Sequence, residues 1–245
     1  MGLPILLLVG PAGSGKDTIA DYLVKSVGAT KLALADPIKR LAKELFHLKD
    51  EQLWGPDKEN EIKYTYDLER LLHDVDTIHL DGHSLSDHQR LLLKKAVRKI
   101  VDYRPFTPRK VIQTLGTDWG RRVDFDFWTN KALHVIKCLM FDLTKSYAPE
   151  KGLYHEPRKS IPPLFIISDG RLIMEIVKIK EHGGQVWKII SNNVKKVGLT
   201  NHVTETEMEM IPDTYFDYFM YNHNGRFEYL TKEIDEQFKI MLGPH

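Results

Sequence analysis

Residues 3–18 read LPILLLVGPAGSGKDT, an apolar run followed by a glycine-rich turn. The run Leu3 to Val9 contains no polar residue, which is typical of a strand buried on both faces of a parallel sheet. After the turn, apolar residues recur at helical spacing between Lys16 and Lys25, which predicts a helix. The stretch therefore predicts a strand, a glycine-rich turn and a helix in direct succession.

The turn itself, Gly10 to Lys16, matches the pattern G-x-x-x-x-G-K. Glycines in this pattern let backbone amides surround phosphate oxygens, and the lysine reaches the terminal phosphates. The helix that begins at the lysine adds the partial positive charge of its N-terminus. A glycine turn with an incidental lysine is the plain alternative, but the position between the first strand and the first helix favours a phosphate-binding loop, or P-loop.

The residue after the lysine departs from the common pattern. A serine or threonine that binds magnesium is expected there, whereas Asp17 occupies the position and Thr18 follows. A carboxylate so close to bound phosphates would repel them unless a cation or a water molecule lies between. The sequence therefore leaves the identity of the magnesium ligand open.

Four more apolar runs have the character of strands. They cover Lys31 to Ala35, Leu164 to Ser168, Val186 to Ile190 and Tyr215 to Met220. Helical patterns alternate with them, starting near Ile38 and covering His88 to Val101, Pro108 to Trp119, Phe125 to Lys145, Leu172 to His182 and Phe227 to Met241. This alternation predicts an α/β fold with a doubly wound, mainly parallel five-stranded sheet, whose ligands bind at the carboxyl ends of the strands.

Residues 49–105 differ in character, because they are rich in charge, histidine and turn residues and carry little strand signal. We interpret them as a helical cap inserted on the substrate side of a core formed by residues 1–48 and 106–245. The length of 245 residues suits one α/β domain with such an insertion. The segment that contains Pro149, Pro157, Pro162 and Pro163 is expected to be a loop.

Charge and cysteine usage limit the function classes. The chain has 35 basic and 34 acidic residues, a net charge of +1, so no long-range field attracts it to nucleic acid or a membrane. We therefore expect no direct nucleic-acid binding and no membrane association. The lone Cys138 cannot form an internal disulfide, and no leader-like segment precedes the first strand, so a cytoplasmic location is expected.

An acidic residue follows the third expected strand. Leu164 to Ser168 leads into Asp169, and Arg171 lies two residues further. A carboxylate at the end of a buried strand beside a P-loop orients magnesium or its water in phosphoryl transfer. The alternative is that Asp169 only caps the next helix, which aspartate does well. The P-loop in the same chain favours the magnesium role.

The segment RKVIQTLGTD at residues 109–118 combines a basic residue and an amide on one helical face. Arg109 and Gln113 are four residues apart, and a Gly-Thr turn follows them. Such groups suit a phosphate and the edge of a base. An ordinary solvated helix face is the alternative.

Five segments, in this order, resemble the deoxynucleoside-monophosphate kinases of tailed bacteriophages, which belong to the P-loop nucleoside monophosphate kinase superfamily. They are GSGKDT at 13–18, LADPIK at 34–39, RKVIQTLGTD at 109–118, ISDGR at 167–171 with Glu175 and Gly183-Gly184 beyond, and HVTE at 202–205 with Asn222. Their order and spacing across most of the chain are more specific than any one motif. Asp17 followed by Thr18 is itself the form that this loop takes in the phage kinases.

The resemblance implies transfer of the γ-phosphoryl group of ATP to a 5′-deoxynucleoside monophosphate, with Mg2+, for phage DNA precursor synthesis in the cytoplasm of an infected bacterium. It also implies a fold related to dephospho-coenzyme A and phosphomevalonate kinases. A kinase of another small phosphorylated metabolite of that type and a non-catalytic nucleotide-binding module are the alternatives. The accepted bases, and the choice between a monomer and a homodimer, stay open.

The resemblance further implies roles for single residues. Trp128 would be a stacking wall, although an aromatic residue at helical spacing is commonly part of the core. The catalytic set is Lys16, Asp17, Asp36, Asp169 and Arg171, and the magnesium ligands are Asp17, Thr18 and Asp169. ATP would be bound by Gly13, Ser14, Gly15, Lys16, Asp17, Thr18 and, beside the adenine, Asn222. The monophosphate would be bound by Asp36, Lys39, Arg109, Lys110, Gln113, Gly116, Thr117, Trp128, Arg171 and Glu175.

One family feature departs in this chain. Relatives often carry an arginine just after the strand that corresponds to Val186 to Ile190, in the region that closes over ATP. Ser191-Asn192-Asn193 stands there instead, so the closing cation is open between Lys195, Lys196 and the pair Arg121-Arg122. His202 and Glu205 are expected to fix a loop rather than to take part in the chemistry.

Overall fold

The computed structural model describes residues 3–63, 66–103, 105–191, 208, 210–223 and 227–242. The chain divides into two compact units. The first contains the residues up to Ala33 and from Ile161 onward, and the second contains Leu34–Ser160. Residues 49–105 lie within the second unit, and their expected role as a cap on the substrate side stays a prediction.

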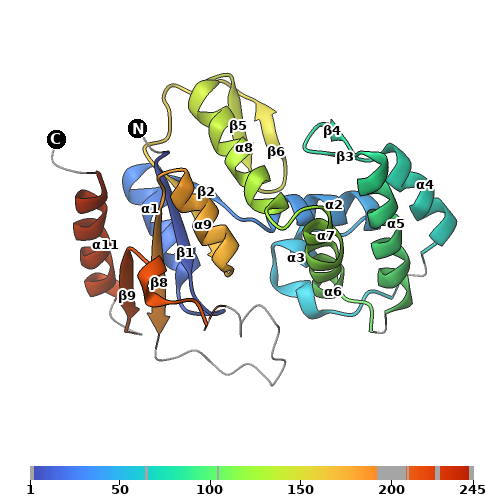
Figure 1. Cartoon of the computed structure of the whole chain (residues 1–245), viewed down its shortest axis with the longest axis horizontal. Helices are drawn as coiled ribbons and strands as arrows, with labels where there is room; N and C mark the ends of the chain where they lie inside the picture. The colour runs from blue at the N-terminus through green and yellow to red at the C-terminus, as the bar shows by residue number, and fades with distance from the viewer. Residues whose placement is uncertain are drawn as a thin grey trace. The chain divides into compact units, whose positions relative to one another are not determined.

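A five-stranded parallel sheet forms the centre of the first unit, in the order β2-β7-β1-β8-β9 (Figure 1). The strands are β1 (Ile5–Val9), β2 (Thr30–Leu32), β7 (Phe165–Gly170), β8 (Gln185–Ser191) and β9 (Tyr218–Asn222). In the middle strand, Leu6 pairs with Ile166 of β7 and with Gln185 of β8. Both faces of this strand are covered, which is why all its residues are apolar. The predicted α/β fold with a five-stranded parallel sheet is confirmed, and it agrees with the P-loop kinase type.

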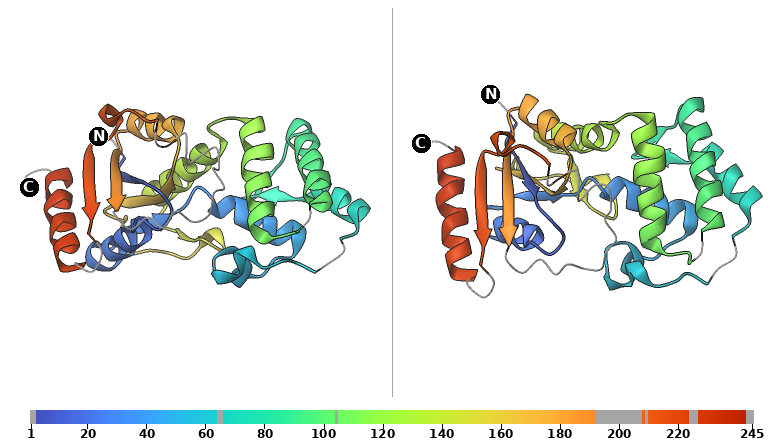
Figure 2. Two further views of the ribbon diagram at one scale, coloured as in Figure 1. Left: turned by 90° about the horizontal axis from the view of Figure 1, so that it is seen from below. Right: turned by 60° about the horizontal axis from the view of Figure 1, so that its bottom comes forward.

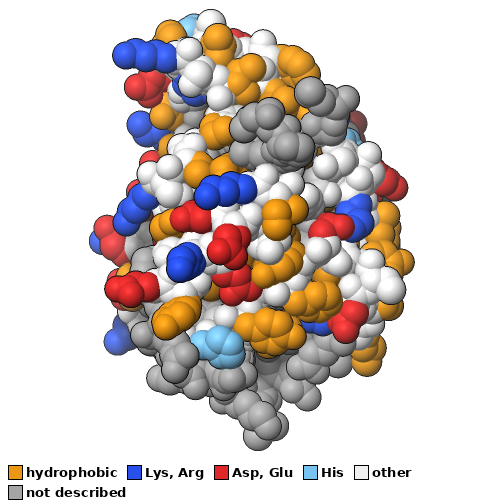
Figure 3. Space-filling view, turned by 90° about the vertical axis from the view of Figure 1, so that its left-hand side faces the viewer, with side chains coloured by type: hydrophobic (Ala, Val, Ile, Leu, Met, Phe, Trp, Pro, Cys, Tyr) orange, Lys and Arg blue, Asp and Glu red, His pale blue; other side chains and the backbone are white. Residues whose placement is uncertain are grey.

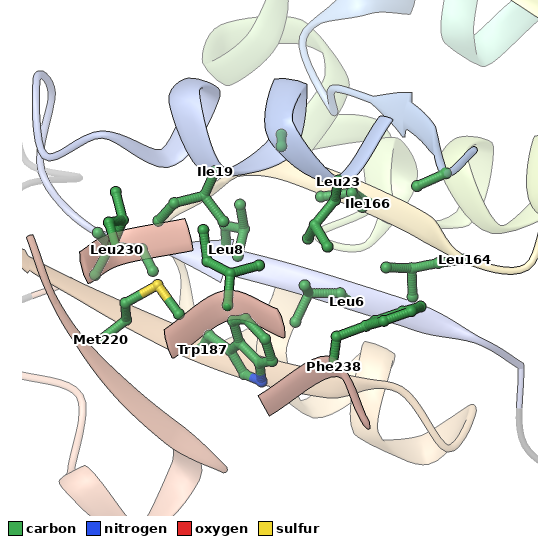
Figure 4. Close-up of a cluster of buried hydrophobic side chains, with 14 residues drawn as sticks. Leu6, Leu8, Ile19, Leu23, Leu164, Ile166, Trp187, Met220, Leu230 and Phe238 are labelled. Carbon is green, nitrogen blue, oxygen red and sulfur yellow. The ribbon is translucent and has the colours of Figure 1, made fainter. Parts of the chain in front are cut away.

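Helices cover both faces of this sheet. On one face, α1 (Lys16–Val27) and α11 (Phe227–Leu242) pack against the side chains of Leu6 and Leu8, with α11 alongside β9 (Figures 2 and 4). On the other face, α9 (Ile173–Glu181) contacts β1, whose odd-numbered side chains point that way. The sheet is therefore covered on both sides, as the alternating pattern of the sequence predicts.

Two strands differ from their predicted bounds for local reasons. β2 ends at Leu32 instead of Ala35, because Ala35 already accepts the first bond of a helix, from Lys39 N at 2.9 Å. β9 begins at Tyr218 instead of Tyr215, because a 3-10 turn, Asp213–Tyr215, precedes it. In both cases the chain turns into a helical segment at one end of the predicted strand.

The second unit consists mainly of helices. Its longest helices are α8 (Phe127–Phe141) and α5 (Asp87–Asp102), followed by α2 (Asp36–Phe46) and α4 (Leu68–Thr77). Shorter helical segments are α3 (Asp50–Leu53), η1 (Pro56–Glu59), α6 (Pro108–Gln113), η2 (Thr114–Gly120) and α7 (Arg121–Val123). Helices at 36–46, 87–102, 108–113 and 127–141 agree with the helical patterns of the sequence.

Two antiparallel hairpins in the second unit were not predicted. They are β3 (His79–Leu80) with β4 (His83–Ser84), and β5 (Lys145–Ala148) with β6 (Gly152–His155). The second hairpin lies where a proline-containing loop was expected, and Gly152, the first residue of β6 after the turn, adopts a φ of +72°. The helix predicted to reach Lys145 ends at Phe141, because Asp142 Oδ1 accepts a hydrogen bond from Thr144 N at 2.8 Å and turns the chain.

The helix expected from Pro108 to Trp119 changes type along its length. It is α-helical to Gln113 and continues as a π-helix, η2, from Thr114 to Gly120. Within this wider segment, the Gly116 carbonyl accepts a hydrogen bond of 3.0 Å from the indole of Trp128. π-helical segments of this kind are frequent at functional sites.

Candidate functional site

The glycine-rich loop, Gly10–Lys16, joins β1 to α1 through a backbone path that only glycine follows easily. Gly13 and Gly15 have φ values of +78° and +100°, in the left-handed region. A side chain at Gly10 would place its Cβ 2.7 Å from the carbonyl oxygen of Ile189 in β8. Backbone conformation thus favours glycine at positions 13 and 15, and lack of space favours it at position 10. The predicted succession of strand, glycine-rich turn and helix is confirmed.

Lys16 lies inside this loop and not on the surface. It is the first residue of α1, is 8% exposed, and donates from Nζ to the carbonyl oxygens of Gly10 at 2.7 Å and Pro11 at 2.8 Å. A buried ammonium group needs such acceptors. The loop therefore surrounds a fixed positive charge at the N-terminus of a helix, which is a favourable arrangement for a phosphate.

Asn222 lies at the end of β9, an edge strand of the sheet, and its side chain holds the glycine-rich loop. Its side-chain Nδ2 donates to the carbonyl oxygen of Ser14 at 2.9 Å. A Cβ at Gly15 would lie 2.3 Å from the same nitrogen, so the close approach requires glycine. The sequence singled out Asn222 as a residue beside adenine, which stays a prediction; the contact with the loop backbone was not foreseen.

Asp17 follows Lys16 on the exposed side of α1 and has a cationic partner. Lys31 of β2 lies 2.8 Å from Asp17 Oδ1, and Ser168 of β7 donates to the same oxygen at 3.3 Å. Partial removal from water would raise the pKa of Asp17, but Lys31, with smaller effects of Ser168 and Lys16, lowers it below its usual value. Lys31 was missed from the sequence, where a lysine in a short strand carries no signal.

Asp169 lies at an irregularity of β7. Leu7 pairs with Ile167 and Val9 with Gly170, so β7 contains one extra residue between these pairs. Such a bulge redirects side chains and is common beside active sites. Ser168 is buried, Asp169 is half-buried, and both follow the buried part of the strand towards the loop end of the sheet.

The start of α9 is capped by Glu175. Its Oε2 accepts from the backbone amides of Arg171 at 2.7 Å and Leu172 at 3.0 Å. These bonds fix the backbone just before α9, whose N-cap position is occupied by Leu172 and not by Asp169. Arg171 is half-buried, and Thr18 of α1 is exposed.

Among the predicted residues of the second unit, Asp36 is the most buried, with 2% of its surface exposed. Its Oδ1 accepts from the indole of Trp54 at 3.1 Å and from Lys39 Nζ at 3.2 Å, and its Oδ2 accepts from Tyr147 at 3.0 Å. Lys39 also lies over the Trp54 ring, 5.4 Å from its centroid. A buried carboxylate with three donors is satisfied and held in one orientation.

Arg40 supports this arrangement from the next turn of the same helix. It donates to Asp81 Oδ1 at 2.6 Å and to the Pro149 carbonyl at 2.7 Å, and its guanidinium lies 6.0 Å from the centroid of the Tyr147 ring. The arginine thereby links α2 to the turn between β3 and β4 and to the β5–β6 hairpin. Neither hairpin was predicted, so these contacts were missed as well.

The predicted residues on α6 and η2 lie closer to the surface. Arg109 is exposed and forms an ion pair with Glu59, and the exposed Lys110 lies 5.1 Å from the centroid of the Tyr103 ring. Gln113 and Gly116 are half-buried, and Thr117 is exposed. The two cations therefore stand next to each other in the first turn of α6.

Trp128 of α8 lies in the core of the second unit. It is 7% exposed and packs edge-on against Trp119 and Phe127, with ring centroids 5.6 and 4.8 Å away. A Cβ at Gly120 would lie 2.3 Å from its indole nitrogen. The geometry gives Trp128 a packing role, and its stacking on a base stays a prediction.

Several predicted residues lie outside the part that the structure describes. These are Asn192, Asn193, Lys195, Lys196, His202 and Glu205. Of the described candidates for the cation that closes over ATP, Arg121 is half-buried and Arg122 is exposed on α7. The identity of that cation stays open.

Two cavities were not predicted from the sequence. The larger, about 720 Å³, lies in the second unit and is lined by residues of α2, α3, η1 and α4 and of the segments between them, such as Phe46, Arg70 and Tyr66, which precedes α4. The smaller, about 350 Å³, lies beside β9 and α11, with Tyr221, His223 and Tyr229 in its wall. The residues predicted for the site, as far as they are described, do not line either cavity.

Membrane-spanning helices, metal-binding clusters and charged surfaces are further features that could indicate a function in the described residues. None of its helices is both long and apolar enough to cross a membrane. In the same residues, no three His, Cys, Asp or Glu side chains gather in a way that could hold a metal ion by themselves. On the face shown in Figure 3, basic and acidic side chains are interspersed, in keeping with the net charge of +1.

The parallel sheet and the glycine-rich loop around Lys16 define an α/β protein whose fold is consistent with the P-loop kinase type. The family model described as "Deoxynucleotide monophosphate kinase" matches residues 4–73, which contain this loop and Asp36. A protein of Acanthamoeba polyphaga mimivirus, named "Putative deoxynucleotide monophosphate kinase", is 46% identical over 232 residues, which are 93% of this chain and 92% of that protein. The chain belongs to the deoxynucleotide monophosphate kinase family.

Proposed function

We propose that this protein is an ATP-dependent kinase that converts 5′-deoxynucleoside monophosphates to the diphosphates. The observation that carries the proposal is the buried Lys16, held by two carbonyls of a glycine-rich loop at the N-terminus of α1. This is a site for a polyphosphate. The family then supplies the acceptor, because the relative's name refers to a deoxynucleotide monophosphate.

The donor nucleotide is assigned to the loop in the first unit. Its residues Gly13, Ser14, Gly15 and Lys16 provide amides and the ammonium group for the phosphates of ATP. Ser14 Oγ is buried and has no hydrogen-bond partner among the described residues, so it can serve a phosphate oxygen as well. Asn222 would act by keeping the loop in shape, in addition to its expected place beside the adenine.

The acceptor is assigned mainly to groups of the second unit. Asp36 and Lys39 on α2, and Arg109 and Lys110 on α6, offer one fixed carboxylate and three cations for a deoxynucleoside monophosphate. Gln113, Gly116, Thr117 and Trp128 complete the proposed set. Arg171 would stabilise the negative charge that spreads over the transferred group, and Glu175 would act by fixing the backbone on which Arg171 stands.

The family implies magnesium, and the donor atoms present are suited to it. Asp17 and Asp169 carry carboxylates, Thr18 a hydroxyl, and hard oxygen ligands of this kind are the ones that Mg2+ prefers. Mg2+ is commonly held by one or two carboxylates together with substrate phosphates, which fits a chain whose described residues offer no complete protein cage. When bound, the ion neutralises charge that develops on the phosphate oxygens.

The reaction needs alignment more than a strong base. An oxygen of the acceptor phosphate forms a bond to the γ-phosphorus of ATP while the bond from that phosphorus to the β,γ-bridging oxygen breaks, which leaves ADP. The acceptor oxygen is already ionised near neutral pH. The cations Lys16, Arg171, Arg109 and Lys110 would therefore contribute by positioning the two phosphates and by balancing charge.

A panel of acceptors tests this proposal. Purified protein with ATP and magnesium should release ADP with at least one of the four common deoxynucleoside monophosphates, measured by a coupled assay and checked by chromatography of the products. Lys16→Ala should lower kcat/KM by roughly a hundredfold or more, the effect of losing a charged group that acts in the transition state. Lys25→Ala is the matched control, because Lys25 is an exposed lysine in the last turn of the same helix.

The same panel separates the alternatives. ADP release only with dephospho-coenzyme A or phosphomevalonate would assign the chain to a kinase of another metabolite. Tight ATP binding with no turnover for any acceptor would identify a non-catalytic nucleotide-binding module. A role in phage DNA precursor synthesis in a bacterial cytoplasm, and a homodimeric state, stay predictions that the panel does not address.

A further inference from the structure

The aspartate that replaces the usual serine or threonine of the loop has a lysine beside it. We infer that Lys31 is a positioning residue that neutralises Asp17, so that the glycine-rich loop can accept the phosphates of a nucleotide. The inference rests on one part of the proposed function, namely that the loop binds a nucleotide polyphosphate, and it does not depend on the identity of the acceptor.

The two elements that meet here are adjacent in the first unit. Asp17 and Asp21 are four residues apart on α1, so their side chains share one face of the helix. Lys31 projects from β2 to this face, with Nζ 2.8 Å from Asp17 Oδ1 and 2.9 Å from Asp21 Oδ1. The lysine is thus shared by two carboxylates, of which only Asp17 directly follows the loop.

The position of the Asp17 carboxylate is fixed from a second strand. Ser168 in β7 is 4% exposed and donates to Asp17 Oδ1 at 3.3 Å, and the bulge with Asp169 follows directly. The same oxygen therefore receives a lysine from β2 and a hydroxyl from β7. An aspartate carboxylate is ionised at neutral pH, so Asp17 places a negative charge in the first turn of α1, directly after the glycine-rich loop.

The charge balance explains why a cation is needed at this place. The positive end of α1 and Lys16 attract phosphate, and an uncompensated carboxylate in the same turn opposes them. A unit charge at a distance of roughly 6 to 8 Å, at an intermediate dielectric, alters the affinity for an anion by roughly three- to thirtyfold. Lys31 removes this opposition while leaving a carboxylate oxygen donor in place beside the loop.

Two other roles for Lys31 give different results in a double-mutant cycle. A lysine that contacts phosphate directly would matter equally with and without the Asp17 charge. A lysine that only joins β2 to α1 would change stability and leave nucleotide affinity unchanged. A lysine that neutralises Asp17 should matter only while Asp17 carries its charge.

The experiment measures ADP binding by isothermal titration calorimetry, with EDTA present so that no metal contributes. Lys31→Met should weaken binding by about tenfold, whereas Lys31→Arg, which keeps the charge, should bind within about twofold of the wild type. In the Asp17→Asn background, Lys31→Met should weaken binding by less than about twofold. Lys25→Met, an exposed lysine in the last turn of α1, should have no effect.

The contrary outcomes are distinct. Equal losses from Lys31→Met in both backgrounds, or no loss in the wild-type background, would overturn the inference. Urea denaturation of each variant shows whether the protein is folded, and a surface ion pair of this kind should alter the free energy of unfolding by less than about 1 kcal/mol. A protein that shows the expected cycle with ADP but phosphorylates no deoxynucleotide would uphold the role of Lys31 and reject the proposed acceptor. A wild type that binds no ADP would reject both.

Discussion

The side-chain amide of Asn222 donates a hydrogen bond of 2.9 Å to the carbonyl oxygen of Ser14, so the edge strand β9 holds the middle of the glycine-rich loop. The backbone at Gly15 approaches the same amide so closely that a Cβ there would lie 2.3 Å from Nδ2. One residue late in the chain therefore fixes the shape of a loop near its beginning. The affinity for phosphate should depend on this bond even though Asn222 carries no charge.

We expect Asn222→Ala to weaken ADP binding by about fivefold, because the loop loses a hydrogen bond worth about 1 kcal/mol. The same loss should appear for GDP, since the bond acts on the loop and not on the base. Calorimetric titration of both nucleotides measures it, with His223→Ala, at the next exposed position, as the control. A loss confined to ADP would instead assign Asn222 to the adenine, as the sequence suggested.

Gly15→Ala should weaken nucleotide binding by more than its loss of stability explains. The substitution forces a φ of +100° on an L-residue and pushes Asn222 away from the loop, so an affinity loss of at least about tenfold is expected. Gly28→Ala is the matched control: Gly28 ends α1 with a φ of +73°, and nothing lies within 4 Å of its Cβ position.

Gly28→Ala should lose about 1 kcal/mol of unfolding free energy in urea because it places an alanine in the left-handed region, and Gly15→Ala should lose about 2 kcal/mol because it also breaks the bond from Asn222. Only Gly15→Ala should lose ADP affinity. Similar ADP affinities for the two variants would show that the shape of the loop at Gly15 is not needed for binding.

The fold and the loop could be predicted because their signals are local. The apolar run Leu3 to Val9, the glycines and Lys16 are consecutive, and each strand–helix alternation is visible within a short window. The hairpin at 145–155 was missed, since Pro149 and the polar residues around it resemble a loop. The π-helical segment was missed as well, because no sequence pattern distinguishes it from the end of an α-helix.

The partners of the predicted residues were much harder to foresee. Lys31 with Asp17, Tyr147 with Asp36 and Asn222 with Ser14 each join positions that only the folded chain brings together. A lone lysine or tyrosine has no periodicity that reveals such a contact. The sequence thus predicts which residues carry the chemistry, and the fold shows which neighbours hold them in place.

Tyr147→Phe should make the protein less sensitive to alkaline pH. Burial, followed by the charge of Asp36, raises the pKa of Tyr147 well above its usual value, so the folded protein keeps this proton above about pH 10, where an unfolded tyrosine loses it. The unfolded state then binds fewer protons than the folded state, and the stability that Tyr147 provides at neutral pH declines as the pH rises above about 10.

Urea denaturation between about pH 8 and pH 11 measures this decline. At neutral pH the variant should lose about 1 kcal/mol, the value of the hydrogen bond to Asp36, and above about pH 10 the difference from the wild type should shrink. Tyr221→Phe, at an exposed position, is the control. A constant difference across the range would contradict the assignment of the proton.

Arg40→Ala should destabilise the second unit by about 3 kcal/mol, because it leaves the buried Asp81 carboxylate without its cation. The side chains of Arg40 and Asp81 are 13% and 6% exposed. Arg90→Ala is the contrasting case, because its partner Asp87 is fully exposed, and a change below about 0.5 kcal/mol is expected. Free energies of unfolding from urea titrations compare the two, and equal losses would show that burial of the pair is not decisive.

Because β7 carries one extra residue, the number of residues between Ile167 and Gly170 matters as much as their identity. Ile167 pairs with Leu7, Gly170 pairs with Val9, and the bulge between them accommodates Ser168 and Asp169. A deletion of one residue here would restore a regular ladder with Gly170 still opposite Val9, but it would remove Ser168 or Asp169 together with the bulge that redirects their side chains. Homologues and engineered variants should therefore tolerate substitutions in this segment more readily than any insertion or deletion.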